Sequence, residues 1–134
     1  MDALIIKATE FTPEVTLDPG SNRFEISGES RPENAGKFYH PILEWLDKYH
    51  SLRYWQDNKF KNKVNNPVFE FKLEYFNSTS AKFILDILKK FEFFKKDDLM
   101  FSVNWYYEDQ DLDMKESGEE FAKMTEASFN IVQI

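Results

Sequence analysis

The chain has 134 residues, of which 42% are hydrophobic and 31% are charged, with only four glycines and five prolines. This composition is typical of a single folded domain over residues 1–134 and argues against a disordered chain. A formal net charge of −7 argues against a protein that tracks nucleic-acid phosphates, because such proteins carry clustered lysines and arginines. We therefore expect protein partners and no nucleic acid.

The absence of cysteine excludes disulfides, thiolate metal sites and a thiol nucleophile. The two histidines, His40 and His50, have no nucleophile or carboxylate at the spacing of a catalytic motif, so we expect neither a cofactor nor a bound metal. The first ten residues lack the basic and apolar regions of a secretion signal, and no stretch approaches about 18 apolar residues. We expect no membrane insertion and a cytoplasmic location.

Three short strands are predicted at the amino end, over residues 4–6, 14–18 and 23–27. The sequence DPGSN at 18–22 supplies turn residues between the last two strands. This arrangement predicts a hairpin.

A first helix is predicted from the capping box formed by Ser30 and Glu33 to about His50, with apolar residues at helical spacing. Pro41 would remove one hydrogen bond of this helix, which predicts a kink or a short break at residues 39–40. The following segment at 57–66, DNKFKNKVNN, has the composition of an exposed loop.

A central strand and a second helix follow. Phe69, Phe71, Leu73 and Tyr75 alternate with charged residues, which predicts a strand with one buried face. From residue 81 the apolar residues recur at three and four positions, which predicts a helix that ends at about Lys95.

The last third of the chain predicts a strand at 100–107, an acidic loop, a helix at 114–124 and a strand at 129–134. The aromatic residues of 100–107 place that strand in the interior of the sheet. Asp113 is expected to cap the last helix, with Phe121 and Met124 facing inward. The whole order, β-β-β-α-β-α-β-α-β, predicts an α/β (α+β) fold: one mixed sheet covered by about three helices.

Three consecutive hydroxyl residues, Ser78, Thr79 and Ser80, stand where the central strand gives way to the second helix. Such hydroxyls often cap the unpaired N–H groups at a helix start. The same N–H groups and the helix dipole also stabilise a phosphate, and Lys82 lies four residues after Ser78. Local chemistry leaves both interpretations open, a cap and a phosphorylation site.

The acidic loop has the spacing of part of an EF-hand, with Asp109, Asp111, Asp113 and Glu120 at the first, third, fifth and twelfth positions. The required glycine is replaced by Met114, and the segment joins a strand to a helix. We therefore expect an exposed acidic loop or a protein-docking surface in place of a calcium site. The sequence contains no GxSxG, P-loop or GxGxxG motif, and we expect a protein that is not an enzyme.

Three segments together resemble the SiaC family of bacterial regulatory phosphoproteins. They are GESRPEN at 28–34, YFNSTSAK at 75–82, and VNWYY at 103–107 with its acidic loop and GEEF at 118–121. The resemblance covers nearly the whole chain and implies an architecture like that of STAS-domain anti-sigma-factor antagonists.

The resemblance implies a signalling switch without enzymatic activity. A cognate serine/threonine kinase phosphorylates the hydroxyl residue after the asparagine, a PP2C-type phosphatase reverses the reaction, and the unmodified form controls an effector such as a diguanylate cyclase, the source of cyclic di-GMP. The position after Asn77 is Ser78, with Thr79 and Ser80 as alternatives. We expect the partner-binding surface to include the following residues: Asn77, Thr79, Lys82, Glu29, Arg31 and Glu33.

Two other functions stay open from the sequence. A constitutive adaptor would use the hydroxyls only as caps and bind its partner without phosphorylation. A small-ligand-binding domain would need a pocket with converging polar groups.

Overall fold

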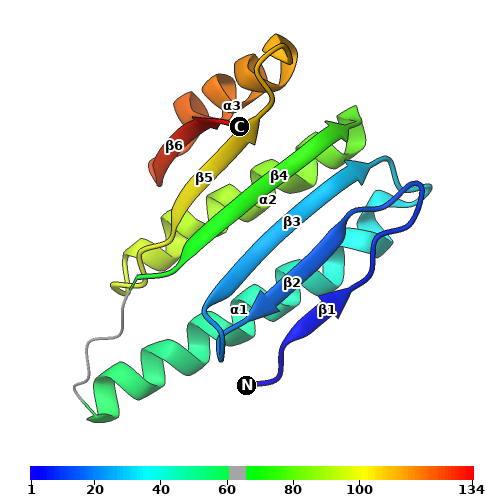
Figure 1. Cartoon of the computed structure of the whole chain (residues 1–134). Coiled ribbons are helices and arrows are strands. Elements are labelled where there is room, and N and C mark those ends of the chain that lie inside the picture. The colour runs from blue at the N-terminus through cyan, green and yellow to red at the C-terminus, as the bar shows by residue number, and fades with distance from the viewer. Residues whose placement is uncertain (61–65) are drawn as a thin grey trace.

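A six-stranded sheet forms one layer of the molecule, in the order β1-β2-β3-β4-β5-β6 (Figure 1). The structure is a computed structural model that describes residues 1–60 and 66–134, with side chains described outside 56–65. The strands are β1 (Leu4–Ile6), β2 (Glu14–Asp18), β3 (Arg23–Ser30), β4 (Val68–Phe76), β5 (Ser102–Tyr107) and β6 (Ser128–Gln133).

Pairing within the sheet is mixed. β1, β2 and β3 pair in antiparallel fashion, whereas β3 to β6 run parallel to one another. The parallel strands are joined by α1 (Ala35–Phe60), α2 (Ser78–Lys95) and α3 (Leu112–Met124). All three helices lie behind the sheet in Figure 1, because right-handed crossovers that advance in one direction return to the same face. The expected α/β fold with one mixed sheet and three helices is confirmed, and β5 is an interior strand.

The core lies between the sheet and the helices and is built from the alternating side chains that the sequence indicated. Phe69, Phe71 and Trp105 are fully buried. The Trp105 ring contacts Phe71 at 5.4 Å and Phe121 of α3 at 5.3 Å between centroids. Aromatic packing therefore fixes α3 against the sheet.

A bulge in β4 interrupts the alternation at the end of the strand. Gly28 pairs with Leu73, and Glu29 pairs with Tyr75, so that Glu74 is an extra residue. The extra residue reverses the facing of the side chains that follow. Tyr75 is consequently 48% exposed, whereas Phe76 packs against Trp105 and Phe121. The prediction that Tyr75 belongs to the buried face was wrong.

The start of α1 differs from the predicted capping box. β3 continues to Ser30, and the helix is capped by Asn34, whose side-chain oxygen accepts a hydrogen bond from Lys37 N at 3.0 Å. The helix passes through Pro41 without a break at residues 39–40 and continues to Phe60, well beyond His50. Residues 57–60 of the predicted loop are thus helical, and 61–65 lie outside the described residues.

The start of α3 also differs. Its cap is Asp111, whose carboxylate accepts from Met114 N at 3.1 Å, and Asp113 lies inside the first turn. Phe121 is buried as expected, but Met124, the last residue of the helix, is 44% exposed. The helix begins two residues earlier than predicted, which accounts for the difference in the cap.

None of the helices in the described residues is both long enough and apolar enough to cross a lipid bilayer.

Candidate functional site

Asn77 caps α2. Its side-chain oxygen accepts hydrogen bonds from Ser80 N at 2.9 Å and from the Thr79 hydroxyl at 3.0 Å. This is the geometry of an N-cap, in which a side-chain oxygen accepts a hydrogen bond from one of the free N–H groups of the first turn. Asn77 is therefore the cap, and the Ser78 hydroxyl takes no part in the capping.

Ser80 is fully buried. Its hydroxyl accepts from the Ser30 hydroxyl at 2.9 Å and donates to the Ser30 carbonyl oxygen at 3.1 Å. The Ser30 hydroxyl also shares a hydrogen bond of 2.5 Å with the Tyr39 hydroxyl of α1. This buried network joins the end of β3 to both α1 and α2.

The network holds the start of α2 in one position. Asn77 N donates to the Ser30 carbonyl oxygen at 3.0 Å, and the Tyr39 ring stacks on Phe83 of α2 at 5.6 Å. Burial raises the pKa of the Tyr39 phenol, which therefore stays protonated. The backbone around Ser78 is thus supported from both neighbouring elements.

Ser78 is the first residue of α2, and its side chain is exposed. Its hydroxyl forms no hydrogen bond to any residue that the structure describes. Thr79 is also exposed, but its hydroxyl donates to Asn77. Lys82 is exposed and, within 1–60 and 66–134, forms no ion pair.

An open pocket of about 480 Å³ lies between the starts of α1 and α2, here called the helix-start pocket. Residues of both first turns line it: Glu33, Asn34, Ala35, Gly36, Ser78, Thr79, Lys82 and Phe83. The structure therefore brings Glu33 together with the hydroxyls and Lys82, although 45 or more residues separate them in the sequence.

Glu29 and Arg31 lie outside this pocket. They form an ion pair of 2.7 Å at the end of β3. The Arg31 guanidinium lies over the rings of Phe11, at 5.7 Å, and Tyr75, at 5.9 Å. The sequence did not indicate Phe11 and Tyr75 as surface residues. Phe11 lies outside the predicted strands, and the bulge that exposes Tyr75 leaves no trace in the alternation of apolar and charged residues along β4.

Each histidine lies beside a carboxylate. His50 bonds to Asp97 at 2.8 Å and stacks on Phe94 at 4.4 Å, and His40 lies 3.8 Å from Glu44. No group of three or more metal-binding side chains occurs in the part of the chain that the structure describes, the acidic loop included.

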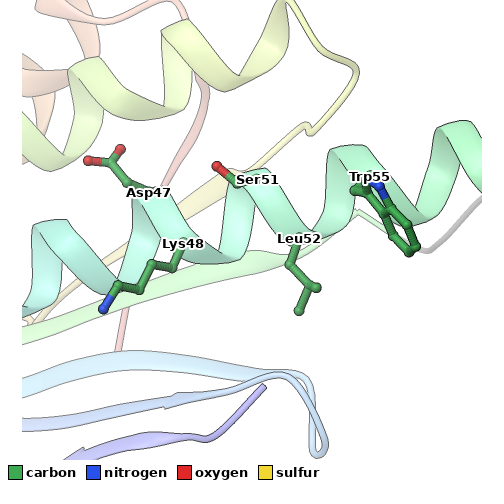
Figure 2. A pocket seen from close by; sticks show the side chains of 5 residues that line it. All are labelled: Asp47, Lys48, Ser51, Leu52 and Trp55. Carbon is green, nitrogen blue, oxygen red and sulfur yellow. The ribbon is translucent and has the colours of Figure 1, made fainter.

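A second open depression runs along α1 and is lined by Asp47, Lys48, Ser51, Leu52 and Trp55 (Figure 2). All five residues belong to the one helix and lie along its surface. The lining offers no convergence of polar groups from several elements, which a small-ligand site requires.

Comparison with known proteins decides the family. The model of the SiaC family of regulatory phosphoproteins matches residues 6–134. The chain belongs to the SiaC family. The resemblance found in its three segments is thereby confirmed, and the family is one of regulatory proteins.

Relatives of this SiaC-family member include proteins from Pseudomonas aeruginosa. An uncharacterized protein is 26% identical over 121 residues, which cover 90% of this chain and 88% of that protein. The structure of SiaC has 23% identity and a TM-score of 0.82, with both chains covered completely. A chain in the structure of the diguanylate cyclase SiaD in complex with its activator SiaC has 24% identity and a TM-score of 0.83, covering 98% of this chain and 99% of that chain. These structures share the fold described above.

Proposed function

We propose that this SiaC-family protein is a cytoplasmic signalling switch that is phosphorylated on Ser78 by a serine/threonine kinase and dephosphorylated by a PP2C-type phosphatase. The protein has no catalytic role of its own. Its unmodified form binds and controls an effector. A diguanylate cyclase is the leading candidate, since the related SiaC is the activator of the diguanylate cyclase SiaD.

One observation carries the proposal: Ser78 offers an exposed hydroxyl without a hydrogen-bond partner among the described residues, on backbone that is held in place. Ser80 is fully buried and inaccessible to a kinase. Thr79 is accessible, but its hydroxyl is engaged by the cap. Among the three hydroxyls, Ser78 therefore suits a phosphoacceptor best.

A phosphate on Ser78 would be tolerated by the fold. It would lie at the first position of α2, where the helix dipole and free N–H groups favour negative charge, and Lys82 lines the same pocket. Glu33 also lines this pocket, and its carboxylate would repel the new charge. A partner that contacts Glu33 and a neutral Ser78 would therefore meet a changed charge pattern while the domain stays folded.

Mass spectrometry of the protein recovered from its own cells tests the acceptor. We expect a species heavier by one phosphate group, with the phosphate on the peptide that contains residues 78–80. Ser78→Ala should abolish this species, and Thr79→Ala should retain it. If Thr79→Ala alone abolishes it, the acceptor is Thr79; if no phosphate is found under any growth condition, the switch itself is wrong.

A capture experiment with the same protein tests the partner. Ser78→Ala should retain the effector from a native lysate, and Ser78→Asp should lose it. Equal capture by both variants would favour the constitutive adaptor, for which the exposed cluster of Phe11, Arg31 and Tyr75 is a suitable contact surface.

A further inference from the structure

The sheet opens between β4 and β5 at their carboxyl ends. The two strands pair only over Val68 to Phe71 and Ser102 to Trp105. Beyond these pairs, β4 continues to Phe76 beside β3, and β5 continues to Tyr107 beside β6. Figure 1 shows the two arrows diverging from a common start. The facing edges of residues 72–76 and 106–107 consequently have no strand partner.

A pocket of about 430 Å³ occupies this opening, here called the β4–β5 notch. It is lined from both strands and from the loop after β5. Its polar lining comes from Lys72, Glu74, Tyr106, Tyr107, Glu108 and Asp111. An unpaired strand edge that borders a pocket is a template for pairing with another extended chain.

Large side chains at the diverging strand ends pack against α3. Phe76 is turned inward by the bulge and contacts Trp105 at 6.0 Å. The Trp105 indole also donates to the Met114 carbonyl oxygen at 2.9 Å, which ties it to α3. Phe76 and Trp105 thus link the ends of both diverging strands to α3.

The charge of the notch is negative. Glu74 and Glu108 have no ion pair among the described residues, and Asp111 adds a third carboxylate. The one lysine of the lining, Lys72, is already paired with Glu25 at 2.8 Å. The neighbouring Glu70 carboxylate raises the pKa of the Tyr106 phenol, which stays neutral. Lys115 lies nearby, over the Tyr107 ring at 5.8 Å.

We propose that the β4–β5 notch binds a short extended segment of a partner protein that carries lysine or arginine. The segment pairs its backbone with the free edge of β4, and its basic side chain meets Glu74 and Glu108. The unpaired edge selects an extended chain, and the three unneutralised carboxylates select the basic residue. This site is separate from the helix-start pocket and requires no phosphorylation.

Blocked tetrapeptides that alternate arginine or lysine with valine, leucine or phenylalanine serve as the probe. We expect at least one of them to shift the backbone amide NMR signals of residues 72–75 and 106–108 in the full chain. The double variant Glu74→Gln/Glu108→Gln should weaken this binding several-fold. The matched control Glu116→Gln/Glu119→Gln, on the exposed side of α3, should leave it unchanged.

Three further probes test whether binding needs both the basic side chain and the backbone pairing. A peptide with glutamate in place of arginine, a backbone N-methylated peptide and spermidine should each bind more weakly than the basic peptide. The proposal is overturned if no basic peptide binds, if the shifts lie elsewhere, if the double variant binds as well as the wild type, or if spermidine or the N-methylated peptide binds equally. Because the measurement uses unphosphorylated protein and no kinase, its failure would leave the proposal for Ser78 unaffected.

Discussion

Ser78 and Ser80 carry the same side chain two positions apart, yet one hydroxyl is exposed and the other is fully buried. Each step along a helix turns a side chain by about 100°, so residues two apart point to nearly opposite sides. The sequence identified the hydroxyl triplet, but the assignment of each hydroxyl required the rotation of α2 about its axis. That rotation is set by the Asn77 cap and by the bond between Ser30 and Ser80.

Substitution by aspartate should separate the two serines. Ser78→Asp places a carboxylate at the first position of α2 and should change the free energy of unfolding by no more than about 1 kcal/mol, in the stabilising direction. Ser80→Asp buries a carboxylate in the network with Ser30 and Tyr39 and should lower the free energy of unfolding by about 3 kcal/mol or more, or prevent folding. Urea unfolding followed by circular dichroism measures both. Equal destabilisation by the two variants would contradict the placement of α2.

At the scale of elements, the helices and strands followed from periodicity, whereas their ends depended on contacts between distant segments. Ser30 and Glu33 satisfy the local rule for a capping box, but Ser30 pairs with Phe76 of β4 and is drawn into the sheet. Pairing across 46 residues cannot be found by a rule that considers four neighbours. The bulge at Glu74 cannot be found from local sequence either, because it is defined by the pairing of β4 with β3.

The packing of α3 depends on one glycine. A Cβ atom on Gly118 would lie 2.4 Å from Cδ1 of Trp105, a fully buried ring that also contacts Phe71 and Phe121. Gly118→Ala should therefore push α3 away from the sheet and destabilise the protein by about 1–3 kcal/mol or more, in spite of the higher helix propensity of alanine.

Thermal unfolding would report this change, as would the near-ultraviolet circular dichroism, to which the buried Trp105 contributes. Ser117→Ala, at the preceding position of the same helix, serves as the control and should have a small effect. A stabilised Gly118→Ala variant would show that α3 does not lie as close to Trp105 as described.

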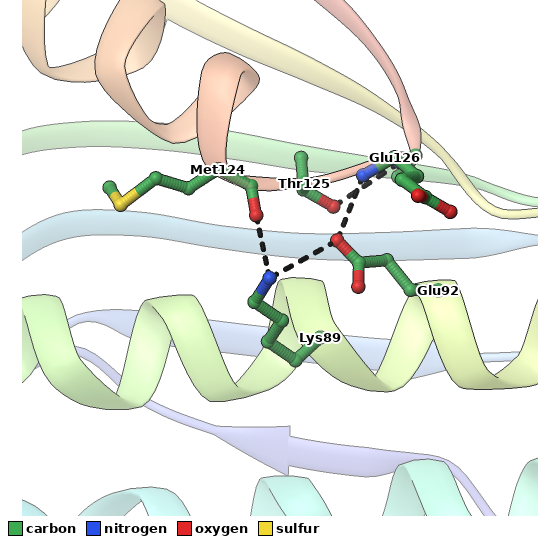
Figure 3. Close-up of polar contacts among 6 residues, drawn as sticks. Lys89, Glu92, Met124, Thr125 and Glu126 are labelled. Carbon is green, nitrogen blue, oxygen red and sulfur yellow. Dashed lines mark hydrogen bonds and ion pairs between the residues drawn. The ribbon is translucent and has the colours of Figure 1, made fainter.

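At the scale of the whole molecule, two carboxylates connect separate parts of the fold. Glu25 of β3 pairs with Arg23 and with Lys72 of β4, each at 2.8 Å. Glu92 of α2 accepts from Glu126 N at 2.8 Å, and Lys89 donates to the Met124 carbonyl oxygen at the end of α3 (Figure 3). Glu92 and Lys89 thus form a clasp between α2 and the segment that joins α3 to β6.

The pKa of both carboxylates is lowered. Burial alone would raise the pKa of Glu25, but its hydrogen bonds to Lys72 and Arg23 outweigh burial. Burial is likewise outweighed at Glu92 by the Glu126 N–H, the Thr125 hydroxyl and Lys89. A folded-state pKa below the ordinary value of 4.5 means that the stabilisation is complete above that pH and is lost as the pH falls through the lowered value.

Stability should therefore stay nearly constant from neutral pH to about pH 5 and decrease below it. Glu25→Gln removes one of the two groups and should make the decrease shallower, whereas Glu119→Gln on the surface of α3 should not. Urea unfolding at a series of pH values measures the slope. An unchanged slope for Glu25→Gln would show that its ion pairs do not form in solution.

The short pairing between β4 and β5 affects how the molecule unfolds. β5, α3 and β6 are contiguous in the chain, and their strand contact with the rest of the sheet is limited to the four residue pairs between β4 and β5. The clasp of Lys89 and Glu92 adds a second attachment on the helix side. Residues 102–134 are therefore held to the rest of the molecule by these strand pairs, by the clasp and by the packing of Trp105 on Phe71 and Phe76, and a partial unfolding step that releases them must break all three.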